Sequence, residues 1–337
     1  AVANGTLALD SSFKALKIGA GDEVIVTART YIASVTSIIN AGATPIFTDV
    51  DLNSQNITFK SVRSKITKKT KAIVCVHLAG WPCEMDEIMN LAKKFNLYVI
   101  EDCSQAHGAR YKGKPVGSIG DIGCWSFCQD KIMTTGGEGG MITTNDKNLW
   151  EKIWSYRDHG KGYESFFRSD HPPGYRWATE SYGTNFRMTE IQSEIGRIQL
   201  RKMDKWHKMR EKNALFLYEY LKDLSILRIP MPSNNFKHAW YKFYAYLKLE
   251  CVSSDWNRDR ILEEINKCGY KALTGSCSEI YLESCFKGKS FCPSSRLPIA
   301  KELGETSLMF LIHPGITFDQ LNKYAEILRK VLLKASN

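Results

Sequence analysis

The first half of the chain alternates short apolar runs with segments of helical periodicity. The apolar runs are EVIVTA (23–28), TPIFTDV (44–50), AIVCVH (72–77), YVIED (98–102), GCWSFC (123–128) and MITTN (141–145). They are rich in β-branched residues and too short for helices, which is typical of buried strands. Segments such as 86–96, with Ile88, Leu91 and Phe95 on one face, separate them. This alternation predicts an α/β fold whose mostly parallel sheet has helices on both sides.

The pattern changes after Arg187, where a second region begins. Thr189 and Gln192 form a capping box, and the apolar residues that follow predict one long helix running past Trp206. The remainder offers a strand at 240–249, a helix around 257–267 and a final helix after Thr317. We therefore expect a large domain over residues 1–205 and a smaller α+β domain over residues 206–337.

Composition and charge narrow the classes of partner. The chain has 337 residues, of which 43% are hydrophobic, and no run approaches the roughly 20 apolar residues of a membrane helix. The net charge of +10 comes from scattered basic residues, with one cluster at 65–71 that is typical of a solvated helix end. We expect neither a membrane nor a nucleic-acid partner. A modest positive field would suit an anionic small molecule such as a sugar nucleotide.

The cysteines indicate a reducing compartment. None of the ten forms a CxxC pair, and Cys75, Cys103 and Cys124 fall in predicted strands or at their ends. Reduced core thiols of a cytoplasmic protein are the preferred interpretation, and no metal site is expected.

Lys131 is the first candidate for chemistry. It follows an apolar strand and precedes glycines at 136, 137, 139 and 140, which permit tight turns. A partly desolvated lysine at a strand end can act as a nucleophile or form a Schiff base. A lysine beside glycines is also often a plain surface residue. The glycine run lacks the GxxxxGK[ST] order of a Walker loop.

Three further positions fit a phosphorylated cofactor. Asp102 ends the strand YVIED, where its carboxylate could keep a pyridine nitrogen protonated or cap the next segment, while Glu101 points to the opposite face. Thr6 is a natural N-cap of a helix that closes at Gly19, and a helix start accepts phosphate. Ser126 could add a hydroxyl to that phosphate or simply bond to backbone.

These residues belong to a longer series of ordered motifs. The series reads N-G-T-x-A-L, G-x-G-D-E-V-I-V with T-Y, G-A-T-P-I-F-x-D-V-D, K-A-I-x-x-V-H, V-I-E-D-C-x-Q-A-H-G-A, G-D-I-G-C-W-S-F-x-x-x-K, G-E-G-G-M-I-T-T-N-D, G-T-N-F-R-M-T and H-P-G-I-T. Across nearly the whole chain it resembles the DegT/DnrJ/EryC1/StrS family of sugar aminotransferases. The resemblance implies the type I fold of pyridoxal-phosphate-dependent aminotransferases and a homodimer with shared active sites.

The resemblance also implies a role for each matching residue. Lys131 matches the lysine that carries pyridoxal 5'-phosphate as a Schiff base and moves the substrate proton. Asp102 matches the partner of the pyridinium nitrogen, Tyr31 the aromatic ring that stacks on the cofactor, and Gln105 the glutamine on its other side or at its hydroxyl. The matching phosphate contacts are the backbone of Thr6 and Leu7, the hydroxyl of Ser126, and Asn185 donated by the partner subunit.

By the same resemblance, an amino acid, L-glutamate, gives its amino group to the cofactor. The resulting pyridoxamine phosphate then aminates a keto-deoxysugar nucleotide, for a surface polysaccharide, lipopolysaccharide or related glycan. The alternatives are a pyridoxal-phosphate-dependent sugar dehydratase and a non-catalytic regulator with the same fold. The related dehydratases carry histidine in place of the lysine, so Lys131 favours transamination. His107 and His313 match positions near the substrate, although a lone histidine is more often a structural residue.

Two departures from the family pattern stand out. An extra glycine gives K-I-M-T-T-G-G-E-G-G where the family usually has K-x-x-T-T-G-E-G-G, which leaves the place of Glu138 open. The family also usually carries some tens of residues ahead of N-G-T that help to form the substrate pocket and the dimer contact. We expect that segment to be missing or unusually short here.

Overall fold

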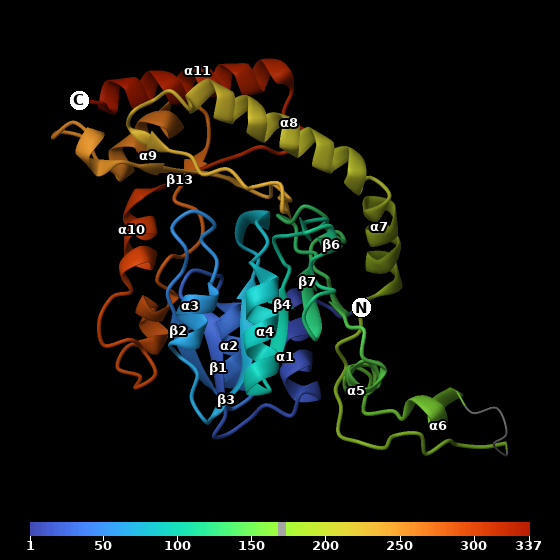
Figure 1. Ribbon diagram of the computed structural model, residues 1–337. Helices are drawn as coiled ribbons and strands as arrows, with labels where there is room; N and C mark the ends of the chain where they lie inside the picture. Colours follow the sequence, from blue (N-terminus) through green and yellow to red (C-terminus); the bar gives the residue numbers. More distant parts are fainter. Residues whose placement is uncertain (168–172) are drawn as a thin grey trace.

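The computed structural model describes residues 1–167 and 173–337, and its centre is a six-stranded sheet in the order β2-β1-β3-β4-β7-β8 (Figure 1). Its strands are β1 (Glu23–Thr27), β2 (Thr44–Thr48), β3 (Thr70–Val76), β4 (Tyr98–Asp102), β7 (Ile122–Ser126) and β8 (Gly140–Thr143). Strands β2, β1, β3, β4 and β7 pair in parallel, and β8 pairs antiparallel with β7. The predicted mostly parallel sheet is confirmed.

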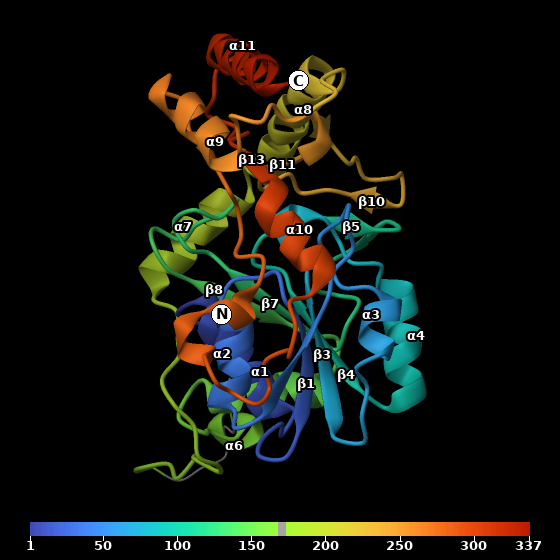
Figure 2. The same cartoon turned by 90° about the vertical axis from the view of Figure 1, so that its left-hand side faces the viewer.

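Helices cover both faces of this sheet (Figure 2). One face carries α1 (Gly5–Ala15), α2 (Ala33–Asn40) and α5 (Lys147–Tyr156); the other carries α3 (Phe59–Arg63) and α4 (Met85–Phe95). Strand β1 shows why its sequence is continuously apolar. Val24 and Val26 join the core under α1 and α2, whereas Ile25 joins the core under α3 and α4, because successive strand residues point to opposite faces.

The predicted long helix after Arg187 is wrong in one respect, because it is two helices. They are α7 (Glu190–Leu200) and α8 (Met203–Leu221), and the chain breaks between them at Arg201 and Lys202. Helix α7 begins with the predicted capping box of Thr189 and Gln192, but buries only Gly196. Helix α8 has buried residues along its whole length, and those of its second half, Ala214, Leu217 and Leu221, join the C-terminal core. The two helices therefore face different surroundings, which continuous periodicity cannot reveal.

The C-terminal part is built on an antiparallel sheet in the order β12-β13-β11-β9. Its elements are β9 (Leu227–Arg228), β11 (Phe243–Leu247), α9 (Arg258–Lys267), β12 (Ala272–Leu273), α10 (Pro298–Thr306), β13 (Ser307–Phe310) and α11 (Phe318–Ala335). The predicted final helix has its capping box at Thr317. The strand expected at 240–249 is shorter, because Trp240 has a φ of 50° and interrupts the extended backbone.

Minor elements complete the fold. They are β5 (Arg110–Tyr111), β6 (Lys114–Pro115) and β10 (Phe236–Lys237) in a small third sheet, helix α6 (Tyr163–Phe167), and the 3-10 turns η1 (Leu78–Gly80), η2 (Leu249–Cys251), η3 (Ile280–Leu282) and η4 (Ser284–Phe286). Helix α10 adds Ala300 and Leu303 to the core beside the main sheet. The domain boundary between residues 205 and 206 stays a prediction. Within the described ranges, no helix combines the length and apolarity that a bilayer crossing requires.

Candidate functional site

A cavity of about 910 Å³ lies at the carboxyl ends of the central strands, facing β11 of the C-terminal part. Strands of a parallel sheet place their ligand-binding loops at this edge. The cavity brings together most of the residues expected from the sequence, namely Thr6, Tyr31, Asp102, Gln105, Ser126 and Lys131. These positions are far apart in the chain, and the parallel topology is what assembles them.

Asp102 ends β4 and is buried, with 6% of its surface exposed. Its Oδ2 accepts a hydrogen bond from the Ser34 hydroxyl at 2.8 Å, and its Oδ1 accepts one from the Ser104 backbone N–H at 3.1 Å. The second bond is the local capping contact that the sequence left open as an alternative. A carboxylate can accept about four hydrogen bonds, so these two leave capacity for a cationic donor in the cavity.

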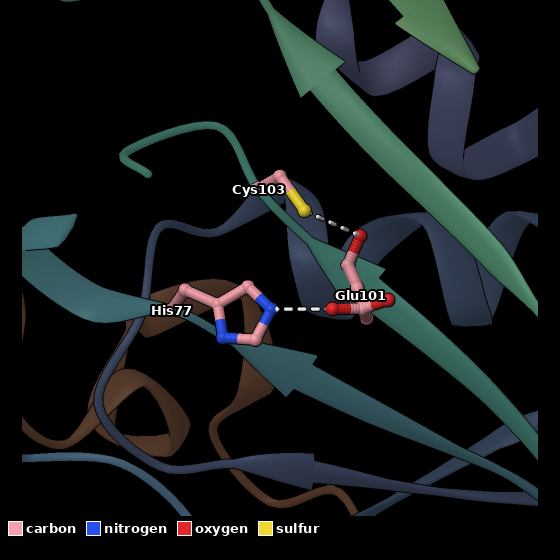
Figure 3. A group of neighbouring side chains, drawn as sticks. All are labelled: His77, Glu101 and Cys103. Carbon is pink, nitrogen blue, oxygen red and sulfur yellow. Dashed lines mark hydrogen bonds and ion pairs between the residues drawn. The ribbon is translucent and has the colours of Figure 1, made fainter. Parts of the chain in front are cut away.

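Glu101 lies on the opposite face of β4, as expected, in a fully buried cluster with His77 and Cys103 (Figure 3). The carboxylate accepts hydrogen bonds from His77 Nε2 at 3.0 Å and from the backbone of Gly117, Ile119 and Gly120 at 2.7–2.9 Å. This carboxylate therefore fixes the strand end that carries Asp102 to the segment following β6.

The same cluster has the spacing of a metal site, since its ligand atoms lie within 4.8 Å of one another. The histidine and carboxylate atoms that could bind a metal already form hydrogen bonds within the protein. His77 Nδ1 accepts from the Cys83 backbone N–H at 3.0 Å while Nε2 donates to Glu101, and both Glu101 oxygens are occupied. Burial raises the pKa of the Cys103 thiol well above its ordinary value, so it stays protonated. The cluster therefore stabilises the fold by linking the end of β4 to the neighbouring segments.

We expect Glu101→Gln to lower the free energy of unfolding by about 2–3 kcal/mol, because a neutral amide cannot serve all four donors. Burial raises the pKa of this carboxyl, but the His77 and backbone hydrogen bonds outweigh it and leave the pKa below its ordinary value. The stabilisation is therefore complete above the unfolded pKa of about 4.3 and is lost as the pH falls through the folded value. Urea unfolding at neutral and acidic pH measures both effects. Equal stability of this variant and the exposed control Glu87→Gln would contradict the role.

The start of α1 forms one wall of the cavity, and here the sequence prediction needs correction. Thr6 is not the N-cap: Asn4 is, and its Oδ1 accepts from the Leu7 N–H at 2.9 Å. The helix also ends at Ala15 rather than Gly19. A helix start leaves its first amides without intrahelical acceptors, and those of Gly5 and Thr6 have no intramolecular acceptor in the described residues. The Leu7 amide is already engaged with Asn4.

Gly5 brings this helix start against Ser126 at the end of β7. A Cβ on Gly5 would come within 2.7 Å of the Ser126 Cβ, so only glycine permits the approach. Main-chain bonds hold the same corner: Val2 and Gly140 exchange two backbone hydrogen bonds, and the Ala3 N–H donates to the Phe186 carbonyl. Free amides and a hydroxyl therefore converge, which suits a phosphate group.

Lys131 lies across the cavity with 16% of its side chain exposed. Its Nζ is 3.5 Å from Asp130 Oδ1 and 5.4 Å from the centre of the Tyr241 ring. The Tyr241 hydroxyl donates to Asp130 Oδ2 at 2.5 Å. Burial raises the pKa of Asp130, but the Tyr241 hydrogen bond and the Lys131 charge outweigh it, so the pKa is lowered and the carboxylate stays charged.

The sequence did not indicate Asp130 or Tyr241 as functional residues. Asp130 adjoins Lys131, which is a weak signal, whereas Tyr241 is 111 positions away in the chain. Only the packing of the C-terminal part against the main sheet brings the two together. Glu138, whose place the extra glycine left open, also lines the cavity.

The two residues expected beside the cofactor ring differ in how they are held. The Gln105 Oε1 accepts from the Ala79 backbone N–H at 2.8 Å, which fixes its side chain at the cavity wall. Tyr31 is 70% exposed although it is aromatic and lines the cavity. An exposed aromatic ring at the mouth of a polar cavity is available for stacking on a planar ligand.

Four predicted residues, namely Leu7, Asn185, His107 and His313, do not line the cavity. Asn185 is exposed, and its backbone forms an isolated antiparallel β-bridge with Asp158. His107 is buried between Trp125 and Phe127, with ring centres 5.5 and 5.6 Å away, and burial together with the Lys131 charge lowers its pKa to about 3. His313 accepts from the Gly315 N–H through Nδ1. The substrate roles of His107 and His313 therefore stay a prediction.

Known proteins are similar to this chain in sequence and in fold. The model of the DegT/DnrJ/EryC1/StrS aminotransferase family matches residues 1–329. The solved structure of an aminotransferase from Psychrobacter cryohalolentis superposes with a TM-score of 0.98 at 55% identity, covering 100% of this chain and 87% of that one. This superposition confirms the predicted aminotransferase fold.

Two curated relatives are similar over different shares of the chain. GDP-perosamine synthase of Escherichia coli O157:H7 is 47% identical over 203 residues, which are 60% of this chain and 53% of that protein. UDP-N-acetyl-3-dehydro-alpha-D-glucosamine 3-aminotransferase of Acidithiobacillus ferrooxidans is 34% identical over 334 residues, which are 98% of this chain and 83% of that protein.

Proposed function

Because the chain belongs to the DegT/DnrJ/EryC1/StrS aminotransferase family, we propose that it transfers the amino group of an amino acid to a keto-deoxysugar nucleotide. The observation that carries the proposal is the convergence of Lys131, Asp102 and the α1 start on one cavity. An amine, a buried carboxylate and a phosphate cradle are the three groups that a pyridoxal phosphate site requires.

The cavity residues fit that cofactor. The amides of Gly5 and Thr6 and the Ser126 hydroxyl would hold the phosphate, with the Leu7 backbone and the partner's Asn185 as further predicted contacts. Asp102 would pair with the ring nitrogen, while Tyr31 and Gln105 would enclose the ring. When bound with its nitrogen protonated, pyridoxal phosphate withdraws electrons from the substrate carbon and makes the proton on that carbon acidic.

Side chains of the protein then transfer the proton of the substrate carbon. The Lys131 amine takes it from the substrate carbon and returns it, and a positioned acid–base group contributes roughly 10²–10⁴-fold to the rate. Asp130 holds Nζ in place and is itself held by the Tyr241 hydroxyl. Burial and the Asp130 charge raise the pKa of Tyr241, so this phenol remains a hydrogen-bond donor throughout.

The substrate class comes from the relatives, whose names specify GDP-linked and UDP-linked sugars. A cavity of about 910 Å³ is large enough for a sugar beside a cofactor, and the net charge of +10 favours a diphosphate. We propose L-glutamate as the donor and a surface polysaccharide, lipopolysaccharide or related glycan as the destination of the product.

We further propose a homodimer with shared sites. In helix α7, Ile191 is 77% exposed and Leu200 is 62% exposed. The segment that precedes α7 in the same chain exposes three aromatic side chains, Tyr175, Trp177 and Tyr182. Figure 1 shows the segment that carries α6 projecting away from the sheet. Apolar surface of this kind is typical of an interface, and Asn185 lies in the same region.

A product assay tests the proposed reaction. The purified protein, loaded with pyridoxal phosphate, is incubated with L-glutamate and a panel of UDP- and GDP-linked 3-keto and 4-keto sugars. We expect one aminated sugar nucleotide by mass spectrometry, with 2-oxoglutarate in equal amount. A deoxygenated sugar without nitrogen would instead indicate a dehydratase, and the absence of any change across the panel would indicate a regulator.

A further inference from the structure

A second lysine lines the cavity beside Lys131. Lys242 immediately precedes β11, and its Nζ lies 4.6 Å from the centre of the Tyr241 ring, against which Lys131 also packs at 5.4 Å. Both ammonium groups therefore contact one aromatic ring at the wall of the same cavity. A ligand that reacts at Lys131 therefore shares its cavity with Lys242.

The charge of Lys242 lacks the partner that Lys131 has. Asp130 lies 3.5 Å from Lys131, whereas Lys242 enters no ion pair in residues 1–167 and 173–337. Burial lowers the pKa of Lys242, Asp130 opposes the shift, and the positive charges of Arg210, Lys131 and Lys271 reinforce it. A half-buried cation among other cations is costly until an anion joins it. The surroundings of Lys242 thus favour a negatively charged ligand.

The distance of the anionic group from the reacting carbon differs between the two substrates. In an amino acid, a carboxylate is attached to the reacting carbon, and in glutamate a second one lies on the side chain. In a nucleotide-linked sugar the diphosphate is on C1, and ring atoms separate it from the ketone that reacts. We propose that Lys242 binds a carboxylate of the amino donor. The inference rests on the proposed aminotransferase function and adds a donor-binding residue to it.

Binding of an unreactive dicarboxylate tests this role directly. Glutarate is titrated into the pyridoxal-phosphate-loaded protein, its Lys242→Met variant and the control Lys248→Met, which alters an exposed lysine at the other end of β11. We expect the glutarate Kd to rise about 10–100-fold in Lys242→Met alone, as for the loss of a charge-assisted hydrogen bond. The Kd of uridine or guanosine diphosphate should stay unchanged in all three proteins. Equal unfolding midpoints confirm that both variants fold.

The outcomes separate this inference from the proposed function. An unchanged glutarate Kd in Lys242→Met, or a weakened nucleoside diphosphate Kd in its place, overturns the donor-binding role. Steady-state kinetics add a second readout, in which the KM for L-glutamate rises and the KM for the keto sugar does not. If the wild-type protein releases no 2-oxoglutarate from L-glutamate, the proposed function itself fails, whatever the glutarate titration shows.

Discussion

Lys131→Ala is expected to abolish amino transfer and the covalent attachment of pyridoxal phosphate together. The side chain supplies the only amine of the predicted catalytic set, and its loss removes a proton-transfer group worth roughly 10²–10⁴-fold along with the bond to the cofactor. We expect kcat to fall by at least about 10⁴-fold. Release of 2-oxoglutarate measures turnover, and borohydride reduction followed by peptide mass spectrometry shows whether the cofactor is attached at residue 131.

Two controls define this result. Lys147→Ala changes a lysine whose side chain is 77% exposed on α5 and should leave both readouts unaltered. Mixing Lys131→Ala subunits with Asn185→Ala subunits should recover part of the activity if each site draws on two subunits. Normal turnover in the purified Lys131→Ala protein would show that the lysine assignment is wrong.

Asp102→Asn should lower kcat by about 10²–10³-fold while the protein stays folded. Asparagine keeps an oxygen for the Ser34 hydroxyl but loses the charge that faces the cavity. Removing one member of a buried charge pair costs about 2–5 kcal/mol, and each 1.4 kcal/mol corresponds to a tenfold change. The rate of 2-oxoglutarate release and the pyridoxal phosphate Kd are measured side by side.

The control for Asp102→Asn is Asp86→Asn, which removes an exposed partner of Lys112. This change should alter neither the rate nor cofactor binding, since surface ion pairs contribute little. A rate within threefold of wild type in Asp102→Asn would mean that this carboxylate only caps the Ser104 turn.

Much of the site could be predicted because it lies at strand ends. The runs at 98–102 and 123–128 predict buried strands, and parallel pairing brings their carboxyl ends together, so Asp102 and Ser126 fall in one cavity. The errors are local. Both Asn4 and Thr6 are good capping residues, and only the backbone decides between them. The break after Leu200 likewise depends on what each helix packs against.

The residues that the sequence could not indicate are those contributed across the cavity. Asp130 meets Tyr241, and Lys242 shares the Tyr241 ring with Lys131, only because the C-terminal sheet packs over the main one. No motif spacing encodes a contact over 111 positions. The apolar pattern predicts a strand at 240–249, but not which catalytic group it faces.

The corner around Gly5 is assembled largely from main-chain hydrogen bonds, including the two between Val2 and Gly140. Such bonds do not depend on which side chains are present, so they tolerate substitution at most neighbouring positions. The opposite wall depends on the side chains of Tyr241 and Lys242. New donor or acceptor preferences are therefore most easily obtained by redesigning that second wall, with the anchoring corner left intact.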